Sequence, residues 1–314
     1  MLPDVVIIIL GLVGLAWGAD KFVFGASAIA RQLGVSPLVI GLTIVALGTS
    51  APEIFSSAIA ALEGQPALAI GNVIGSNIFN IGMALGLAIL IRPLVPPATM
   101  IRQELPVLLL VTVITGLLLI DGHLGVTDSI VLIAVLILVG YSLAQKKARE
   151  GATDEDNTEP ARILRAAIYL ALGLLLLILS AEALVRAATS VAEAIGVSPG
   201  IIGLTLVAMG TSLPELATTA ACALRGHHDL AIGNIIGSNI LNILVVLPFP
   251  GLLAAGAIEP GLVARDYSTM LIMTVVLSVV VFAAIRGHRS IGRFSGALFL
   301  LMYLGWFTLM YYQL

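Results

Sequence analysis

The sequence predicts an all-α integral membrane protein in which ten transmembrane helices form two inverted repeats of five. Composition, a long internal duplication and the placement of basic residues lead to this prediction. Of the 314 residues, 59% are hydrophobic and 11% are charged, whereas a soluble domain carries about 25% charged residues. The composition is typical of a polytopic helical membrane protein and excludes an ordinary soluble domain.

The duplication relates positions that lie 162 residues apart. Between 36–80 and 198–242, 28 of 45 aligned positions are identical and no gap is needed. The duplicated motif extends over 36–85 and 198–247. The relation also includes the amino-terminal apolar segment, which we therefore interpret as a spanning helix rather than a signal peptide.

Ten apolar segments are each long enough to cross a bilayer. We expect them near 4–30, 37–62, 67–91, 104–121, 125–145, 163–194, 199–224, 229–254, 265–286 and 293–312. A polar segment, 146–162, separates a first repeat (1–145) from a second repeat (163–314) and is expected to be a flexible linker.

An odd number of spans per repeat gives the two repeats opposite orientations in the membrane. With the amino terminus outside, the inside loops carry basic residues from Arg31 to Arg293, and the outside loops carry only Arg265. This bias predicts that both termini lie outside and that the linker is cytoplasmic. Lys21 and Arg186 fall within predicted helices, where Asp20 and Glu182 are candidate partners.

Each repeat holds one glutamate inside apolar sequence, in the motif Gly-Thr-Ser-x-Pro-Glu at 48–53 and 210–215. A charged side chain near the bilayer centre costs roughly 2.5–3.5 kcal/mol, so two matching ones require a reason. The proline interrupts the helix and leaves backbone carbonyls free, which is tolerated only in buried or water-lined sites. Carbonyl, hydroxyl and carboxylate oxygens together favour a hard cation such as Ca²⁺.

The candidate ligands are all oxygen atoms of the duplicated motifs. They are the carboxylates of Glu53 and Glu215, the side-chain oxygens of Ser50, Ser76, Ser212, Ser238, Asn80 and Asn242, and backbone carbonyls between Ala46 and Thr49 and between Ala208 and Thr211. The segments that supply these oxygens, near 46–53, 71–80, 208–215 and 233–242, contain no histidine or cysteine, which argues against zinc or copper. The alternative is helix packing, with asparagines as interhelical hydrogen-bonding groups and Gly71, Gly75, Gly233 and Gly237 as close-approach positions.

Other features predict less. His227-His228-Asp229 could bind a metal or sense pH, although a solvated turn is the expected state. The single cysteine, Cys222, excludes an intrachain disulfide. No basic patch with interleaved aromatics indicates a nucleic-acid partner, and no resident cofactor is expected; membrane lipid is the expected surrounding partner. The duplicated serines lack a His or Lys partner, so an intramembrane protease is not indicated, and an enzyme is not expected.

The paired motifs resemble those of the cation/calcium antiporter superfamily, most closely its prokaryotic sodium/calcium exchangers, over nearly the whole chain. The resemblance implies a sodium/calcium exchanger-like fold, exchange of several Na⁺ for Ca²⁺ by alternating access, a prokaryotic inner or plasma membrane, and function as a monomer. By motif position it assigns Ca²⁺ to Glu53 and Glu215 with the carbonyls of Thr49 and Thr211. It assigns Na⁺ to the same glutamates, the carbonyls of Ala46 and Ala208, and Ser50, Ser76, Ser212 and Ser238, with Asn80 and Asn242 bordering the centre.

One departure from some relatives, the potassium-dependent exchangers among them, is asparagine rather than aspartate at Asn242. This implies K⁺-independent exchange. The linker is too short for the regulatory domain of animal exchangers. Two alternatives stay open: an H⁺/Ca²⁺ or other divalent-cation antiporter on the same scaffold and, more distantly, a cation channel.

Overall fold

The computed structural model describes residues 2–149, 160–196 and 208–312. Its first half contains α1 (Leu2–Gln32), α2 (Pro37–Ile40), η1 (Gly41–Val45), α3 (Ala46–Thr49), α4 (Ala51–Leu62), α5 (Pro66–Phe79), η2 (Asn80–Leu85), α6 (Gly86–Ile91), η3 (Ala98–Arg102), α7 (Glu104–Leu119), β1 (His123–Leu124) and α8 (Val126–Arg149). Its second half contains α9 (Pro160–Ala194), α11 (Ala208–Gly210), α12 (Leu213–Arg225), α13 (His228–Leu241), η5 (Asn242–Val246), α14 (Pro248–Leu253), β2 (Gly256–Ala257), η6 (Leu262–Tyr267), α15 (Ser268–Arg286) and α16 (Arg293–Tyr312).

The described helices agree with the predicted spans. Seven are long and apolar enough to cross a membrane, and an eighth is the pair Pro37–Thr49 and Ala51–Leu62, bent by 46°. The two other predicted spans are 125–145, where α8 lies, and 199–224, which is described from Ala208 onward. Both helices extend into the predicted linker 146–162, because α8 continues through Arg149 and α9 begins at Pro160; the division into two repeats joined by this linker stays a prediction.

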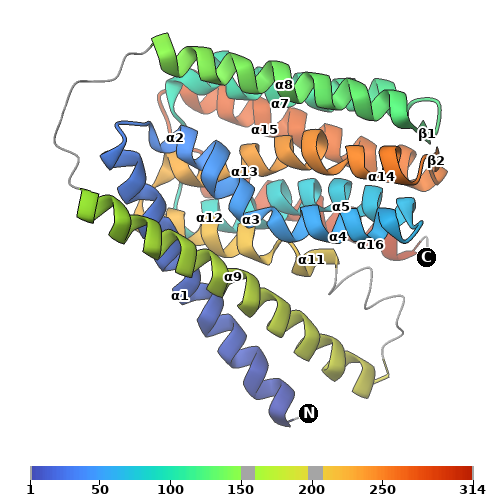
Figure 1. The fold of residues 1–314 in the computed structure, drawn as a ribbon, viewed down its shortest axis with the longest axis horizontal. Helices are drawn as coiled ribbons and strands as arrows, with labels where there is room; N and C mark the ends of the chain where they lie inside the picture. The colour runs from blue at the N-terminus through green and yellow to red at the C-terminus, as the bar shows by residue number, and fades with distance from the viewer. Residues whose placement is uncertain (1, 150–159, 197–207, 313–314) are drawn as a thin grey trace.

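The helices α1 and α9 pack against each other, and the pair extends away from the other helices (Figure 1). Glycines allow this close approach. A Cβ added at Gly25 would lie 2.5 Å from the backbone nitrogen of Leu170, and one added at Gly173 would lie 2.4 Å from that of Phe22. Only glycine fits at these positions, so the two helices form one packed unit.

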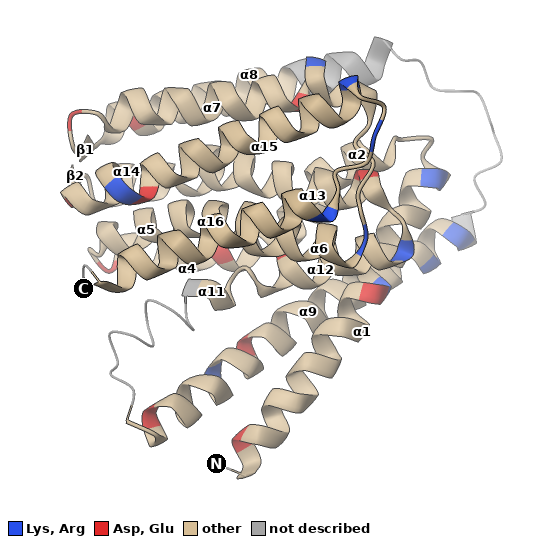
Figure 2. Ribbon diagram, turned by 180° about the vertical axis from the view of Figure 1, so that it is seen from behind, with Lys and Arg blue, Asp and Glu red and all other residues tan. Residues whose placement is uncertain are grey.

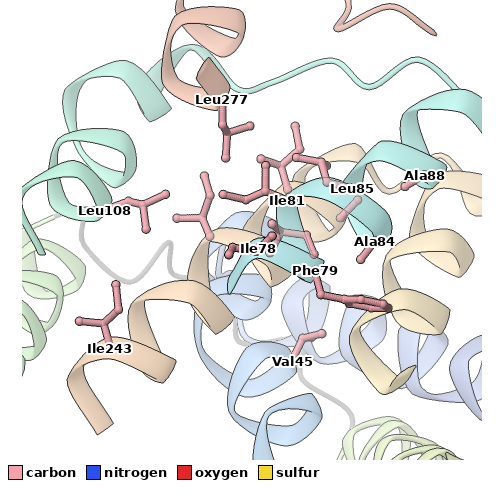
Figure 3. Close-up of a cluster of buried hydrophobic side chains, with 14 of the residues drawn as sticks. Val45, Ile78, Phe79, Ile81, Ala84, Leu85, Ala88, Leu108, Ile243 and Leu277 are labelled. Carbon is pink, nitrogen blue, oxygen red and sulfur yellow. The ribbon is translucent and has the colours of Figure 1, made fainter. Parts of the chain in front are cut away.

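Two spans form the centre of the remaining helices. The most apolar stretch of Pro66–Ile91 is 72% buried, and that of His228–Leu253 is 83% buried. The corresponding stretches of α1 and α9 are each only 22% buried. Helices that are apolar all round belong in the interior. Figure 3 shows part of this core, where Ile78, Ile81 and Leu85 of the first central span face Leu108 of α7 and Leu277 of α15.

Backbone pairing joins the two repeats at both ends of α7. Beyond its carboxyl end, β1 pairs antiparallel with β2, with His123 opposite Ala257. Before its amino end, Leu94 and Ile291 exchange hydrogen bonds of 3.2 and 2.7 Å. The core of the molecule is therefore held together by main-chain bonds between the repeats as well as by side-chain packing.

Basic residues gather mainly at one end of the helix bundle (Figure 2). The charged residues within predicted helices have the local partners expected for them. Lys21 lies 3.6 Å from Asp20, and Arg186 lies 2.5 Å from Glu182.

The prediction that glycines permit close helix approach is confirmed for the second repeat. A Cβ at Gly233 would lie 2.8 Å from the Leu38 carbonyl, and one at Gly237 would lie 2.6 Å from the Leu42 carbonyl. Gly71 and Gly75 meet no described atom within 4 Å. The segment related to 38–42 by the offset is 200–204, which lies outside the described residues, so this half of the prediction stays a prediction.

A candidate ion site between the two repeats

The helix breaks occur at Ser50 and Ser212, one in each repeat. Their φ and ψ angles are −83° and 5°, and −90° and 5°, which lie outside the helical region. In both repeats the proline occupies the first turn of the next helix, where its missing N–H costs little. Glu53 and Glu215 follow in that same first turn, where the positive end of the helix dipole favours a negative charge.

Both glutamates are completely buried, and each is held by a serine of the other repeat. Ser212 Oγ donates to Glu53 Oε1 at 2.7 Å, and Ser50 Oγ donates to Glu215 Oε1 at 2.8 Å. The breaks of the two repeats therefore face each other, and the two carboxylates lie at the interface between them. A hydroxyl that donates its hydrogen to a carboxylate keeps its lone pairs for a further electropositive partner.

Two more serines complete this cluster. Ser76 Oγ lies 3.0 Å from Ser212 Oγ, and Ser238 Oγ donates to Glu215 Oε1 at 3.4 Å. Both serines are buried. All four predicted serines are thus linked by hydrogen bonds to the two glutamates or to each other.

The predicted threonines are held by asparagine amides across the same interface. Thr49 Oγ1 donates to Asn234 Oδ1 at 3.2 Å, and Asn234 Nδ2 donates to Thr219 Oγ1 at 3.1 Å. The related bonds of the other repeat run from Thr211 Oγ1 to Asn72 Oδ1 at 3.4 Å and from Asn72 Nδ2 to Ser57 Oγ at 2.9 Å. These networks position the backbone at the two breaks.

The predicted asparagines lie where the central spans become π-helical. η2 begins at Asn80 and η5 begins at Asn242, and single π-helical turns often mark functional positions. Asn80 Nδ2 donates to Asn239 Oδ1, and Asn242 Nδ2 donates to Asn77 Oδ1, each at 3.0 Å. Both side chains are buried.

Four buried oxygens of this region receive no hydrogen bond from the described residues. They are Oε2 of Glu53, Oε2 of Glu215, Oδ1 of Asn80 and Oδ1 of Asn242, two pairs related by the offset of 162. A buried acceptor without a donor costs about 1–3 kcal/mol, and more when it is charged. A cation bound beside such an oxygen would supply the missing electropositive partner.

The predicted carbonyl ligands are placed less completely. The Ala46 carbonyl accepts the Ser50 amide at 2.9 Å, so one of its two lone pairs is occupied, and Thr49 Oγ1 lies 3.3 Å away as an alternative donor. Ala208 begins α11, the first described element after the gap in the second repeat.

In the part of the chain that the structure describes, the loop histidines belong to no metal-binding cluster. Among the described residues, no group of three or more His, Cys, Asp or Glu side chains could hold a metal ion. Burial and the nearby Arg31 and Arg225 guanidinium groups lower the pKa of His227, which favours the neutral form of its side chain. Its backbone amide caps α12 by donating to the Cys222 carbonyl at 2.9 Å, in agreement with the expected turn.

Comparison with known proteins identifies the family. The family model described as "Sodium/calcium exchanger protein" matches residues 4–143 and 165–312. The chain belongs to this family of cation/calcium antiporters. Members of the sodium/calcium exchanger family are membrane ion transporters, and the resemblance seen in the paired motifs is confirmed.

Two curated relatives and one solved structure extend over nearly the whole exchanger chain. The putative antiporter CaxA of Alkalimonas amylolytica is 40% identical over 99% of each chain. The inner membrane protein YrbG of Escherichia coli is 39% identical over 99% of this chain and 98% of its own. The sodium-calcium exchanger NCX_Mj, soaked with Na⁺ and without Ca²⁺, superposes with a TM-score of 0.84 at 35% identity over 96% of each chain. These matches confirm the predicted exchanger-like fold.

Six residues of the site's hydrogen-bond networks were not singled out by sequence reasoning. They are Ser57, Asn72, Asn77, Thr219, Asn234 and Asn239. Four of them are asparagines that stand in identical positions of the duplicated motif. That identity was a usable signal, because a polar residue kept in both copies of an apolar helix has a partner to reach.

Proposed function

We propose that this exchanger is a secondary active antiporter that exchanges Na⁺ for Ca²⁺ by alternating access, with Glu53 and Glu215 as the shared cation ligands. One observation carries the proposal. Two buried carboxylates from opposite repeats each have one oxygen held by a serine and the other without a hydrogen-bond donor among the described residues. The sodium-calcium exchanger NCX_Mj, with its closely similar fold, supports Na⁺ as the counter-ion.

Ca²⁺ would take its ligands from both repeats. Ca²⁺ prefers 6–8 oxygens, and the candidates are the carboxylates of Glu53 and Glu215, the carbonyls of Thr49 and Thr211, and bordering oxygens of Asn80 and Asn242. The two carboxylates carry a charge that one Ca²⁺ neutralises. Because the ligands come from two inverted repeats, one ion at this site bonds to both halves of the protein.

Na⁺ would use the same glutamates together with the serines. In this proposal Ser50, Ser76, Ser212 and Ser238 contribute hydroxyl oxygens, and Ala46 and Ala208 contribute carbonyls. Each carboxylate is shared between the two cargo sets, so Ca²⁺ and the full set of Na⁺ exclude each other.

Exchange, rather than leak, follows from the cost of the empty site. Two unpaired carboxylates in a low-dielectric interior repel each other and lose their hydration. Closing the protein around an empty site is therefore unfavourable. Only a site filled by Ca²⁺ or by Na⁺ passes readily between the two access states, which makes the two fluxes obligatory partners.

The packed pair α1 and α9 would provide the moving gate, sliding across the core that bears the site. A monomer of this K⁺-independent exchanger is sufficient for this movement.

The repeats 1–145 and 163–314 have opposite orientations in this arrangement, and both termini lie outside. Cysteines placed near residues 4 and 312 should react with a membrane-impermeant thiol reagent from outside in whole cells. Labelling only after permeabilisation would contradict this orientation.

The deciding experiment measures ⁴⁵Ca²⁺ uptake into proteoliposomes under an outward Na⁺ gradient and, separately, under an outward H⁺ gradient at equal ionic strength. We expect uptake under the Na⁺ gradient, insensitivity to K⁺, and no uptake under the H⁺ gradient alone. Uptake under the H⁺ gradient alone would instead identify an H⁺/Ca²⁺ antiporter in which the two glutamates release protons as Ca²⁺ binds. Conductance without a counter-ion would identify a channel.

A further inference from the structure

Four buried asparagines cross-link the two central spans in a reciprocal pattern. Asn77 Nδ2 donates to the backbone carbonyl of Asn239 at 3.3 Å, and Asn239 Nδ2 donates to the backbone carbonyl of Asn77 at 3.4 Å. Asn242 Nδ2 donates to Asn77 Oδ1, and Asn80 Nδ2 donates to Asn239 Oδ1, each at 3.0 Å. All four side chains have at most 1% of their surface exposed.

The backbone carbonyls determine which way every amide in this group points. A carbonyl oxygen only accepts hydrogen bonds, so the Asn77 atom that faces the Asn239 carbonyl must be Nδ2. The sulfur of Met270, a weak acceptor 3.4 Å from the same nitrogen, agrees with this assignment. Asn77 Oδ1 then points the other way and requires a donor, which Asn242 supplies through Nδ2. The remaining atom of Asn242, Oδ1, is the one left without a hydrogen bond.

The same sequence of bonds holds in the other direction. The Asn77 carbonyl orients Asn239, Asn239 Oδ1 takes the Nδ2 group of Asn80, and Asn80 Oδ1 is left without a hydrogen bond. Each set starts at a main-chain atom and ends at a free amide oxygen. Main-chain atoms survive a change of side chain, so the two sets can be broken one at a time.

We infer that Asn77 and Asn239 are positioning residues that turn the oxygens, rather than the NH₂ groups, of Asn242 and Asn80 toward the cation. The inference rests on the proposed function of this site as a cation site. An amide presents a partial negative charge at its oxygen and a partial positive charge at its nitrogen. If the amide were free to rotate, its NH₂ group would face the ion for part of the time, and the affinity of the site for the cation would fall.

The pairing is crossed, and this makes the inference testable. Asn77 acts on Asn242 of the other repeat, and Asn239 acts on Asn80. A residue that merely stabilises the core would weaken binding through either amide alike. A positioning residue loses its effect only when its own partner amide is removed.

The test is a set of double-mutant cycles on Ca²⁺ affinity, measured by equilibrium ⁴⁵Ca²⁺ binding to the purified protein in detergent. We expect Asn77→Ala to weaken Ca²⁺ binding about five- to tenfold, as for the loss of one buried hydrogen bond. When Asn77→Ala is added to Asn242→Ala, Ca²⁺ affinity should fall by no more than about a further twofold. When Asn77→Ala is added to Asn80→Ala, Ca²⁺ affinity should fall by the same roughly five- to tenfold factor as in the single variant.

The mirrored cycle uses Asn239→Ala with Asn80→Ala as the matched pair and with Asn242→Ala as the crossed pair. Equal coupling in matched and crossed pairs, or no effect of Asn77→Ala and Asn239→Ala on affinity, would overturn the inference. If Asn77→Ala does not yield a monodisperse protein, Asn77→Ser replaces it, because serine is too short to bridge the Asn239 carbonyl and Asn242. Failure of the site to act as a cation site would be recognised separately, since the unmodified protein would then bind no Ca²⁺, and failure of the Na⁺ coupling alone would leave Ca²⁺ binding and these cycles intact.

Discussion

Around the candidate ion site the two repeats form matching hydrogen bonds, whereas at the contact between α1 and the core they do not. Ser50 and Ser212 each reach the glutamate of the other repeat at nearly equal distances. At the contact between α1 and the core, Arg225 Nε of α12 donates to Asp20 of α1 at 2.8 Å, and the Arg225 guanidinium lies over the ring of Phe24. This ion pair fastens α1 to the core.

Among the described residues, α9 has no equivalent ion pair with the core at the related positions. The positions related to Arg225 and Asp20 by the offset of 162 are Glu63 and Glu182, both acidic. Glu182 pairs instead with Arg186 on its own helix. Since two carboxylates repel each other, α9 cannot be fastened to α4 in the same way. The duplication has kept its reciprocal serine–glutamate bonds where the ion would bind and has lost the ion pair where the proposed gate meets the core.

The largest expected effect tests whether the two halves of the site are equivalent. Glu53→Gln and Glu215→Gln should each weaken Ca²⁺ binding by about a hundredfold or more, because each removes one of two buried charges that face the cation. Both should abolish ⁴⁵Ca²⁺ uptake while the protein still inserts and elutes as one species. Normal uptake in either variant would show that one repeat alone holds the ion.

The next effect compares two related glycines in the α1–α9 contact. A Cβ at Gly173 would lie 2.4 Å from the backbone nitrogen of Phe22, whereas a Cβ at Gly11 would lie 3.1 Å from the Leu184 side chain. Gly173→Ala should destabilise the protein by about 1–3 kcal/mol, and Gly11→Ala by less than about 1 kcal/mol. Thermal unfolding in detergent measures both, with Gly305→Ala, which has no neighbour within 4 Å, as the control. A larger loss at Gly11 would contradict the observed packing.

A smaller effect separates the two serines. Ser50→Ala and Ser212→Ala each remove a hydrogen bond to a buried carboxylate, worth about 1.5–3 kcal/mol. Ser212→Ala should weaken Ca²⁺ binding more, because Ser212 also lies within hydrogen-bonding distance of Ser76. Calorimetric titration of the two purified variants gives the comparison. Greater loss in Ser50→Ala would mean that the bond to Ser76 contributes nothing.

The smallest expected effect belongs to the asymmetric ion pair. Asp20 and Arg225 are about one-third exposed (39% and 33%), and pairs of this kind contribute about 0–1 kcal/mol. Asp20→Asn should therefore change the ratio of inward to outward Ca²⁺ flux by at most about fivefold, without changing Ca²⁺ affinity. Glu182→Gln, at the related position, should leave the ratio unchanged. An equal change in both variants would show that the ion pair of Asp20 with Arg225 does not affect the flux ratio.

The fold was predictable because its signals can be read directly from the order of residues in the sequence. The duplication, the apolar lengths and the prolines after Ser50 and Ser212 predicted the spans and the two breaks, and the structure agrees with them. The bonds that shape the site were not predictable. Ser50 and Glu215 lie 165 residues apart, and nothing in either motif states that the serine of one repeat bonds to the glutamate of the other. The same limit applies to Asn77, whose partners lie in the opposite repeat.

The main-chain pairing at the two ends of α7 has a consequence for the timescale of motion. The amides of Leu94 and Ile291, and that of Ile258 bonded to the Gly122 carbonyl at 2.8 Å, join loops that belong to different repeats. If transport moves α1 and α9 past a rigid core, these amides should exchange their hydrogens with deuterium as slowly during turnover as at rest. The core would then stay rigid throughout the transport cycle, because the main-chain hydrogen bonds between the repeats at both ends of α7 would not open.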